Sequence, residues 1–309
     1  MLTEKTIIVR DRPRTPRLSV LTPFYRYDPS AMLNRFGVAP ADVEFILLDD
    51  GSASAGLVAN AVNAAQATGA PARVIVSGEN LGRSRARNRL IAEAQGEYVL
   101  FLDADMLPDT TRFLQVWLGI IATQAPRVAF GGLSLAHAQR TPETALHHAL
   151  FGGSDCRPAR QRARRAAQTT ASSNLLVERA FLLTHPFDDA FIGWGFEDVD
   201  WALDVARNEE IMHVDNPATH VGLDDVATLM RKSAEAGPNF GRLARKHPLQ
   251  VKHFAAHRIA RALRATPARK AQQRLYSWIA RDPRGLAPMR VRCAAFKLLR
   301  ASHYAEHLA

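Results

Sequence analysis

Two carboxylates stand two residues apart at the end of an apolar run. Asp103 and Asp105 follow YVLFL (residues 98–102), a run that is typical of a buried strand. Because the chain leaves the sheet at this point, both side chains can converge on one ligand. Carboxylate oxygens of this kind suit Mg²⁺ or Mn²⁺ held together with a diphosphate. A solvated turn would use the same two residues, so spacing alone leaves both interpretations open.

A second acidic pair follows a glycine-rich turn. The segment GWGFED ends in Glu197 and Asp198, which open a helix expected to run to Arg207. The helix N-terminus stabilises their negative charge, and the two glycines before them let the chain approach a ligand closely. Trp194 offers a flat apolar face between those glycines. The alternative is an aspartate that only caps the helix.

Strands and helices alternate around the first acidic pair. Strands are predicted at 17–22, 43–48, 72–76 and 98–102, with helices at 57–68 and 82–94 between them. This βαβαβ order predicts an α/β fold with a mostly parallel, doubly wound sheet, whose ligands collect at the carboxyl ends of the strands. Asp49-Asp50-Gly51-Ser52 and Asp103-Ala104-Asp105 both follow strands and so fall at those ends.

The later part of the body predicts further elements. A helix is expected at 112–123, and strands are expected at 128–131 and 172–177. The arginine-rich segment 157–165 predicts a mobile loop. Ser172-Ser173-Asn174 could line a pocket, or could be ordinary edge positions of a strand.

Four short motifs follow one another along the first third of the chain. They are SVLTP (19–23), DDGS (49–52), NLG with ARN (80–88) and LDAD (102–105). Together they resemble the nucleotide-sugar half of family 2 glycosyltransferases of the GT-A fold. The resemblance implies a GT-A catalytic domain over residues 17–245, with a nucleotide-sugar half at 17–110 and an acceptor half at 111–245.

The GWGFED segment (193–198) carries a second resemblance. It is similar to the GWGGED signature of galactosyl- and N-acetylhexosaminyl-transferring members of this fold, including chondroitin-polymerase-like enzymes. In that setting Trp194 would face a pyranose ring. The departure is Phe196, where the signature usually has glycine, and it bears on which sugar is accommodated.

The two resemblances imply roles for the acidic residues. Asp198 would be the general base that takes the proton of the acceptor hydroxyl, a contribution of about 10²- to 10⁴-fold, and Glu197 would hold the acceptor. Asp105 would bind Mn²⁺ or Mg²⁺ with His220, because members of this fold often place a histidine after the ED helix. His213 competes for this role, and a histidine with only a structural hydrogen bond is the alternative.

The resemblance also implies a binding site for the nucleotide-sugar. Asp49 or Asp50 would accept hydrogen bonds from uracil and ribose, and Arg83 and Arg87, one helical turn apart, could reach base or phosphate. Arginines on a solvated helix face are the alternative. The donor-binding residues implied are Pro23, Asp49, Asp50, Arg83, Arg87, Asp103, Asp105 and Trp194.

The function implied is metal-dependent hexosyl transfer. A hexose of the galactose, N-acetylhexosamine or glucuronic acid class would move from a UDP-sugar to a saccharide or glycolipid acceptor, in bacterial-type polysaccharide or glycan synthesis. Inversion at the anomeric carbon follows from the analogy with family 2, because a GWGxED motif also occurs in retaining relatives.

Composition excludes several other classes. Hydrophobic residues make up 47% and charged residues 23% of the 309 residues, so the chain is neither disordered nor a coiled coil. Two cysteines exclude a disulfide framework. The longest apolar stretch, Phe113 to Ala122, is half of a membrane span, and the start has no apolar stretch of signal-peptide length. These features predict a soluble, cytoplasmic protein.

The charge is divided sharply along the chain. Residues 1–244 hold 25 Lys and Arg against 28 Asp and Glu, whereas residues 245–309 hold 15 against 2. Residues 1–16 are expected to be a lead-in and 246–309 a basic helical extension, with three helical stretches separated by Pro267, Pro283 and Pro288. Two of these stretches have amphipathic faces, formed by Phe254, Ala255, Ile259, Ala262 and Leu263 and by Val291, Ala295, Leu298 and Leu299.

Such helices predict that the protein binds peripherally to the anionic inner face of a membrane, where a lipid-linked acceptor would be found. The alternative is that the apolar faces pack on the catalytic domain and the charges face water.

Two other functions remain as alternatives. A sugar-nucleotide pyrophosphorylase would need a glycine-rich phosphate loop after the first strand, where Thr22 to Arg26 contains no glycine. A basic nucleic-acid-binding protein would explain the charge of the extension. No recognition motif accompanies that charge, and the acidic clusters would repel a polyanion, so we expect no nucleic-acid partner.

Overall fold

The central sheet sets the architecture. The computed structural model describes residues 4–11, 15–264, 266 and 268–308. Within them an eight-stranded sheet has the order β1-β4-β3-β2-β5-β9-β7-β10. Its strands are β1 (Glu4–Arg10), β2 (Leu18–Phe24), β3 (Val43–Asp49), β4 (Ala72–Ser77), β5 (Tyr98–Leu102), β7 (Val128–Phe130), β9 (Asn174–Glu178) and β10 (Met212–His213). A small second sheet has the order β6-β11-β8, from β6 (Met106–Pro108), β8 (Leu133–Ser134) and β11 (Ala218–His220).

The middle of the large sheet is parallel, as the sequence predicts. β2 pairs in parallel with β3 and β5, and β3 with β4, so Val20 lies between Phe45 and Leu100. β1, β9 and their neighbours are antiparallel. The predicted α/β fold with a mostly parallel sheet is therefore confirmed. Residues 4–10, expected as part of a lead-in, form the edge strand β1.

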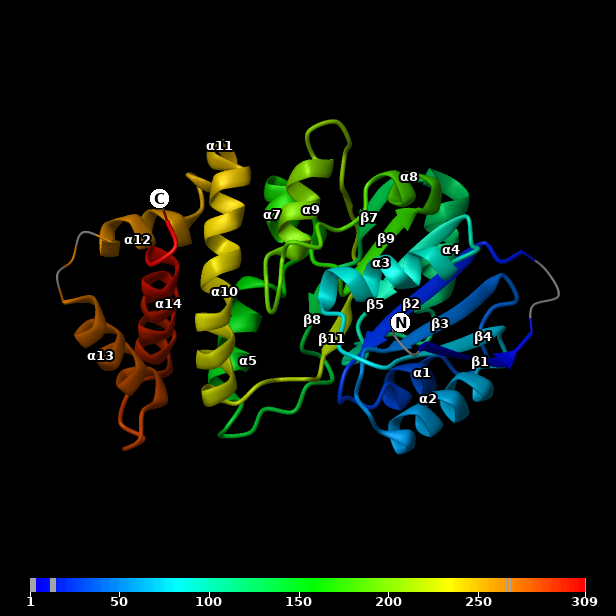
Figure 1. Cartoon of the computed structure of the whole chain (residues 1–309), viewed down its shortest axis with the longest axis horizontal. Helices are drawn as coiled ribbons and strands as arrows, with labels where there is room; N and C mark the ends of the chain where they lie inside the picture. The colour runs from blue at the N-terminus through cyan, green and yellow to red at the C-terminus, as the bar shows by residue number, and fades with distance from the viewer. Residues whose placement is uncertain (1–3, 12–14, 265, 267, 309) are drawn as a thin grey trace.

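Helices cover both faces of the large sheet (Figure 1). α1 (Ser30–Phe36), α2 (Ala55–Ala67) and α4 (Phe113–Gln124) pack on one face, against alternate strand residues such as Val20 and Phe45. α3 (Arg83–Glu93), α8 (Arg179–Thr184) and α9 (Glu197–Val205) pack on the other face, against Leu21 and Ile46. Because helices cover both faces of the sheet, the side chains on both faces of a central strand are buried. Each of these strands is therefore a continuous apolar run in the sequence.

Six further helices gather at one end of the molecule, at the left of Figure 1. They are α5 (Ala145–Ser154), α10 (Val226–Lys246), α11 (Pro248–Val251), α12 (Ala255–Arg264), α13 (Arg269–Arg281) and α14 (Met289–Ala305). α14 packs against α5, α10, α12 and α13. Pro283 and Pro288 lie between α13 and α14, and Pro267 lies outside the described residues.

The predicted amphipathic faces of the extension are partly buried against the body, whereas their residues Ala255, Ala262 and Val291 are exposed. Phe254 and Leu263 belong to an apolar cluster with α10. Ala295 and Leu299 of α14 pack in a second cluster with Leu146 of α5. The buried side chains of these faces therefore pack on the body of the protein. No described helix is both long and apolar enough to cross a bilayer.

The arginine-rich segment 157–165 is not the predicted mobile loop. It forms α6 (Ala159–Arg162) and a 3₁₀ turn (Ala163–Arg165), followed by α7 (Ala166–Thr169). Arg162 is only 2% exposed, its guanidinium lies 5.0 Å from the ring centroid of Phe130, and its Nη2 donates to the carbonyl of Val214 at 2.7 Å. The prediction is wrong because backbone carbonyls and an aromatic face bind this guanidinium inside the fold.

Candidate functional site

A cavity of about 310 Å³ lies where the predicted acidic residues meet. Six of the predicted site residues line it, namely Arg83, Asp103, Asp105, Trp194, Asp198 and His220. Other parts of the chain complete the wall with His147, Asp155, Lys232, Phe296 and Arg300. The cavity therefore joins the carboxyl end of β5, the start of α9, β11 and the C-terminal helix α14.

Asp105 and His220 form one wall as a hydrogen-bonded pair. β11 pairs antiparallel with β6, and this register places His220 Nε2 3.1 Å from Asp105 Oδ2. Burial alone would raise the pKa of Asp105, but the hydrogen bond and positive charge of His220 lower it. Burial alone would lower the pKa of His220, and Asp105 raises it. A Cβ at Gly222 would lie 2.4 Å from Asp105 Oδ2, so only glycine fits beside this carboxylate.

This pair fits a divalent metal. An imidazole nitrogen with a carboxylate oxygen is a ligand set that Mn²⁺ accepts, with substrate oxygens completing the coordination. The buried Nδ1 of His220 has no hydrogen-bond partner among the described residues. Asp105 and His220 are thus the side chains that would hold the metal.

Asp103 has different partners. Its Oδ1 accepts a hydrogen bond from Arg87 Nη2 at 2.9 Å, and its Oδ2 lies 3.8 Å from Arg83 Nη2. Both arginines also reach Glu197 Oε1, Arg83 through Nε and Arg87 Nη1 at 3.4 Å. Burial alone would raise the pKa of Glu197, but Arg83 and Arg87 lower it. This network ties α3 to α9, and two of its members line the cavity, Arg83 with 39% and Asp103 with 20% of its side chain exposed.

Asp198 stands next to this network at the start of α9. Its Oδ1 accepts a hydrogen bond from the amide of Val199 at 2.8 Å. Burial, followed by the negative charge of Glu197, raises the pKa of Asp198 to about 6. The side chain is therefore charged at neutral pH and able to take up a proton just below it.

The turn before α9 is held from outside by the C-terminal helices. Phe196 has φ +73°, a left-handed conformation that costs about 1 kcal/mol or more in residues other than glycine. Its ring packs 5.2 Å from Phe240 and 5.5 Å from Tyr304, which stack on each other at 4.3 Å. Asn239 Nδ2 donates to the carbonyl of Gly195 at 3.0 Å. Aromatic packing thus stabilises a backbone conformation that glycine would adopt freely.

The predicted nucleotide residues at the ends of β2 and β3 lie outside the cavity. Asp50 accepts from the amides of Leu81 at 2.6 Å and Gly82 at 3.1 Å, which fixes the turn before α3. Asp49 accepts from the amide of Ser52 at 3.0 Å. Pro23 pairs with Leu48 in the sheet. The structure therefore places these three residues at a neighbouring strand end and not with Asp105.

The competing histidine lies elsewhere. His213 is in β10, where its Nδ1 lies 3.0 Å from Arg162 Nη1. Burial and the charge of Arg162 lower the pKa of His213 to about 4. Of the two histidines, His220 is the one that meets Asp105. Ser173 lines the cavity, whereas Asn174 is fully buried and donates to the carbonyl of Gly132 at 2.8 Å.

Sequence reasoning missed a group that faces His220. The ring of His147, from α5, lies 5.5 Å from that of His220, and its Nδ1 accepts from the amide of Asp224 at 2.7 Å. Burial and the charge of His220 lower the pKa of His147 to about 4. Lys232 Nζ donates to both carboxylate oxygens of Asp224, at 2.9 and 2.7 Å. No local motif marks these residues, because α5 and α10 bring them together from distant positions.

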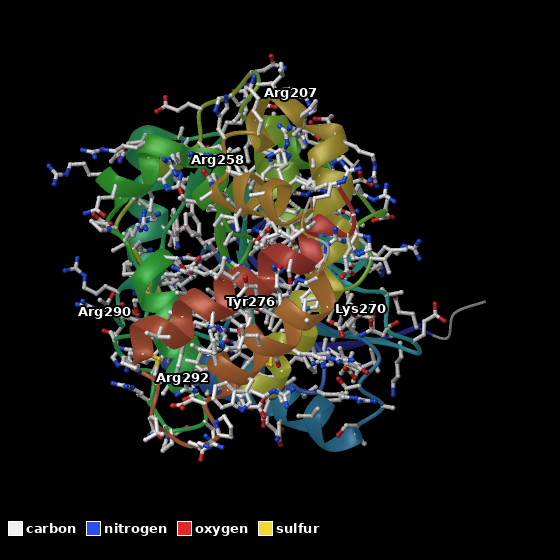
Figure 2. All side chains as sticks on the ribbon, turned by 90° about the vertical axis from the view of Figure 1, so that its left-hand side faces the viewer. Arg207, Arg258, Lys270, Tyr276, Arg290 and Arg292 are labelled. Atoms are coloured by element: carbon white, nitrogen blue, oxygen red, sulfur yellow. The ribbon has the colours of Figure 1, made fainter. Side chains whose placement is uncertain are left out.

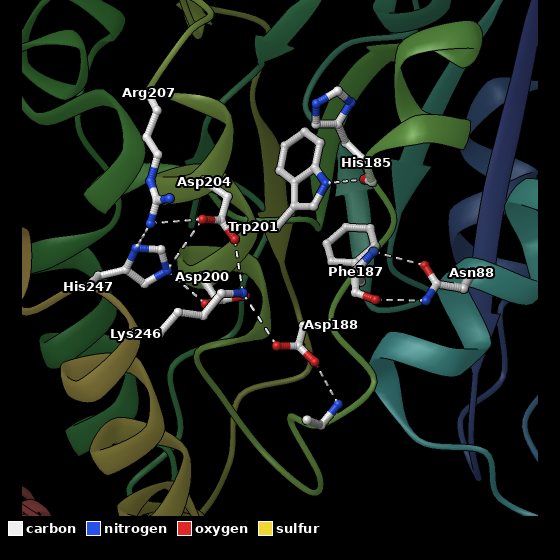
Figure 3. Close-up of polar contacts among 11 residues, drawn as sticks. Asn88, His185, Phe187, Asp188, Asp200, Trp201, Asp204, Arg207, Lys246 and His247 are labelled. Carbon is white, nitrogen blue, oxygen red and sulfur yellow. Dashed lines mark hydrogen bonds and ion pairs between the residues drawn. The ribbon is translucent and has the colours of Figure 1, made fainter.

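A second His–carboxylate cluster joins α9 to α10 (Figure 3). The ligand atoms of Asp200, Asp204 and His247 lie within 4.8 Å of one another, close enough to hold a metal ion. Lys246 Nζ already lies among them, 2.7 Å from Asp200 Oδ2 and 2.9 Å from Asp204 Oδ2. Arg207 Nη2 adds a second cation 3.2 Å from Asp204 Oδ1. We call these five residues the ionic clamp, because a lysine ammonium neutralises the carboxylates there.

Comparison with known proteins identifies the fold. Structures of similar fold include Staphylococcus aureus TarS (TM-score 0.54, 16% identity, covering 94% of this chain and 89% of that chain). They include a mannosyltransferase from Pyrobaculum calidifontis in complex with GDP-Man and Mn²⁺ (0.57, 17%, 94% and 86%). They also include glucosyl-3-phosphoglycerate synthase from Mycobacterium tuberculosis with Mn²⁺ and UDP (0.50, 18%, 75% and 80%). At these identities the likeness shows a shared GT-A fold.

The family match adds the sequence evidence. The family model "Glycosyl transferase family 2" matches residues 19–166, from β2 through β5 and Asp105 to α7. This segment, just under half of the chain, therefore matches a family 2 glycosyltransferase domain, and the chain has the GT-A fold. No curated protein matches the sequence.

Proposed function

We propose that this chain transfers a hexose from a UDP-sugar to a hydroxyl of a saccharide or lipid-linked acceptor. The observation that carries the proposal is that Asp105, His220 and Asp198 line one cavity of about 310 Å³. A ligand pair suited to a metal-bound diphosphate and a carboxylate suited to general-base chemistry thus face the same space. Similar structures with UDP-GlcNAc and with UDP and Mn²⁺ support a uridine donor.

In this proposal Asp198 removes the proton of the attacking hydroxyl. A pKa of about 6 keeps its carboxylate charged at neutral pH, yet close enough to that pH to accept a proton efficiently. Glu197 and Arg87, both buried, hold α3 against α9 and so position Asp198. Arg83 can donate from the cavity wall to a phosphate oxygen. A Mn²⁺ or Mg²⁺ ion held by Asp105 and His220 supplies charge neutralisation for the leaving diphosphate.

The proposed sugar is a hexose of the galactose, N-acetylhexosamine or glucuronic acid class. Trp194 supports it because this residue lines the cavity and an indole can pack against a sugar ring. Phe196, which departs from the GWGGED signature, packs on Phe240 and Tyr304, so its ring is directed to the C-terminal helices. Direct attack by a hydroxyl activated at one carboxylate gives inversion, and the product would belong to a bacterial-type polysaccharide or glycan.

A donor screen tests the proposal. The full chain is incubated with Mn²⁺ and, separately, with UDP-galactose, UDP-N-acetylglucosamine, UDP-glucuronic acid and GDP-mannose, and the nucleoside diphosphate released is measured. We expect release from one of the UDP-sugars and its loss on adding EDTA. Release from GDP-mannose alone, or from none of the four, would contradict the proposal.

We also propose that the outer face of the C-terminal helices binds an anionic membrane surface, in the cytoplasm, where a lipid-linked acceptor would be found. Figure 2 looks onto this end and shows Arg258, Lys270, Arg290 and Arg292 spread over it. On α13, Leu275 and Trp278 are 53% and 52% exposed and lie one turn apart. Each basic residue near an anionic leaflet contributes about 1 kcal/mol, so these charges with an exposed indole favour reversible binding.

Vesicle sedimentation tests this surface. The C-terminal helices are kept in the protein and substituted instead of being deleted, because α14 lines the cavity and its removal would also change the proposed active site. We expect the full chain to bind vesicles rich in anionic lipid at low salt, and the double variant Leu275→Ser, Trp278→Ser to bind less. Val38, which is 81% exposed near α1, provides the matched control Val38→Ser. Equal binding to neutral vesicles, or an unchanged double variant, would contradict the proposal.

A further inference from the structure

Arg300 differs from the other cations of the cavity in having no carboxylate partner. Arg83 pairs with Glu197 and Lys232 pairs with Asp224. Arg300 also lines the cavity, yet it makes no hydrogen bond or ion pair with any residue in the described part of the chain. One positive charge of the cavity wall therefore remains available to a ligand.

The fold fixes the position of Arg300 on α14. Phe296, Arg300 and Tyr304 follow one another at intervals of four residues, so they share one face of α14. Phe296 and Tyr304 are 3% and 2% exposed. Phe296 lines the same cavity, and Tyr304 packs on Phe196 in the turn that carries Asp198. Arg300 thus stands between two buried residues on the face of α14 that borders the cavity with Asp105 and Asp198.

One carboxylate is near enough to act on Arg300 without pairing with it. Asp155, at the end of α5, lies in the same wall and feels the charge of Arg300. Burial raises the pKa of Asp155, and its carboxylate already accepts a hydrogen bond from Ser154. Asp155 therefore acts on Arg300 through its charge, but no hydrogen bond or ion pair joins the two side chains in the described part of the chain.

We propose that Arg300 binds an anionic group of the acceptor, a carboxylate or a phosphate, and so makes the enzyme selective for a charged acceptor. The inference rests on the proposed function and adds the acceptor's chemical class to it. The donor's diphosphate has its own partners in the Asp105–His220 metal site and in Arg83. A guanidinium binds carboxylate and phosphate with two parallel hydrogen bonds, so either anion fits its chemistry.

The test compares charged and neutral probes on the full chain saturated with UDP and Mn²⁺. Methyl β-glucuronide and glycerol 3-phosphate carry the carboxylate and the phosphate, and methyl β-glucoside is the neutral probe. We expect at least one anionic probe to bind about tenfold or more tighter than the glucoside, the difference expected for one charge-assisted pair. Arg300→Met should abolish this preference, and Arg300→Lys should keep part of it.

Lys297, exposed on the same helix, gives the matched control Lys297→Met, which should keep the preference. Binding of UDP with Mn²⁺ is measured on each variant, since it reports the proposed donor site independently of the acceptor. An equal loss of UDP affinity in Arg300→Met would assign Arg300 to the donor and overturn the proposal. A wild-type protein without any preference for the anionic probes would overturn it as well.

Discussion

Two of the His–carboxylate pairs in the described residues have opposite surroundings. In the cavity His220 Nε2 lies 3.1 Å from Asp105 Oδ2, and in the ionic clamp His247 Nε2 lies 2.8 Å from Asp200 Oδ1. Lys246 places its ammonium against Asp200 in the clamp, whereas Asp105 has only His220 as an ion-pair partner among the described residues. The same residue types thus form a structural link in one place and a ligand site in the other.

The two pairs differ in the origin of the group that balances the charge of the carboxylate. Burial alone would lower the pKa of Lys246, but Asp200 and Asp204 raise it, so the ammonium stays charged inside the clamp. His247 and Asp200 are 0% and 1% exposed, so this charge balance is closed. Asp105 and His220 line a cavity, and in the proposed function a bound ligand would complete their charge balance. A search for metal sites by residue type alone would select the clamp, and the neighbouring cations decide against it.

Substitutions of two aspartates of α9 should show the largest difference between the cavity and the ionic clamp. Asp198→Asn keeps size and helix capping but removes the proton acceptor, so transfer should fall by about 10²-fold or more. Binding of UDP with Mn²⁺ should survive. Asp200→Asn, two residues further along, should lower the stability of the fold and leave the turnover of the folded protein within a few-fold of wild type. An Asp198→Asn enzyme with near-wild-type turnover would move the base elsewhere.

Removing Lys246 should allow the ionic clamp to bind a metal ion. Lys246→Ala leaves Asp200 buried without its cation, which should lower the free energy of unfolding by about 3 kcal/mol. Because Asp200, Asp204 and His247 keep ligand atoms within 4.8 Å, added Zn²⁺ or Mn²⁺ should restore part of that loss. Urea denaturation with and without metal measures both effects. Wild-type stability in the variant would show that Lys246 contributes little to the clamp.

The pH dependence of transfer should follow Asp198. Its pKa is raised, so protonation removes the base as the pH falls through about 6, and below that value turnover should drop about tenfold per pH unit. Above about pH 7 this group should no longer limit the rate. The residual activity of Asp198→Asn should lack this acidic limb. A wild-type profile that stays flat down to pH 5 would be inconsistent with Asp198 as the base.

The smallest expected effect concerns the sugar face of the cavity. Trp194→Ala should weaken binding of the UDP-sugar a few-fold and leave binding of UDP almost unchanged, because the indole would contact the hexose and not the nucleotide. Calorimetric titration with each ligand measures the difference. Equal losses for both ligands would make Trp194 a packing residue of the turn.

The sheet could be predicted because each strand is a buried apolar run bounded by turn or acidic residues. The parallel order follows from the alternating helices, and the acidic ends of β3 and β5 follow from that order. The sequence could not predict the structure of the segment 157–165, because Arg162 is buried there through contacts with Phe130 and with carbonyls that are distant in the chain.

The sequence motifs predicted which segments carry the site residues, but they did not predict which side chains pair with one another. Asp105, Asp198 and Trp194 stand in recognisable segments, and the structure brings them to one cavity. Arg87 and Glu197 looked like ligand-binding residues, yet each is buried with the other as a partner. His147 and Arg300 reach the cavity from helices without any motif, and such long-range placement depends on packing that no local pattern encodes.

Manganese-dependent UDP binding is the most direct test of the central claim that the Asp105–His220 pair, and not the clamp, holds the metal. Calorimetry would compare the wild type with Asp105→Ala and with Asp204→Ala, which removes a clamp carboxylate but leaves Asp200 paired with Lys246 and His247. We predict Mn²⁺-dependent UDP binding in the wild type and in Asp204→Ala, and its loss in Asp105→Ala. Unchanged binding in Asp105→Ala, or loss in Asp204→Ala alone, would contradict the account.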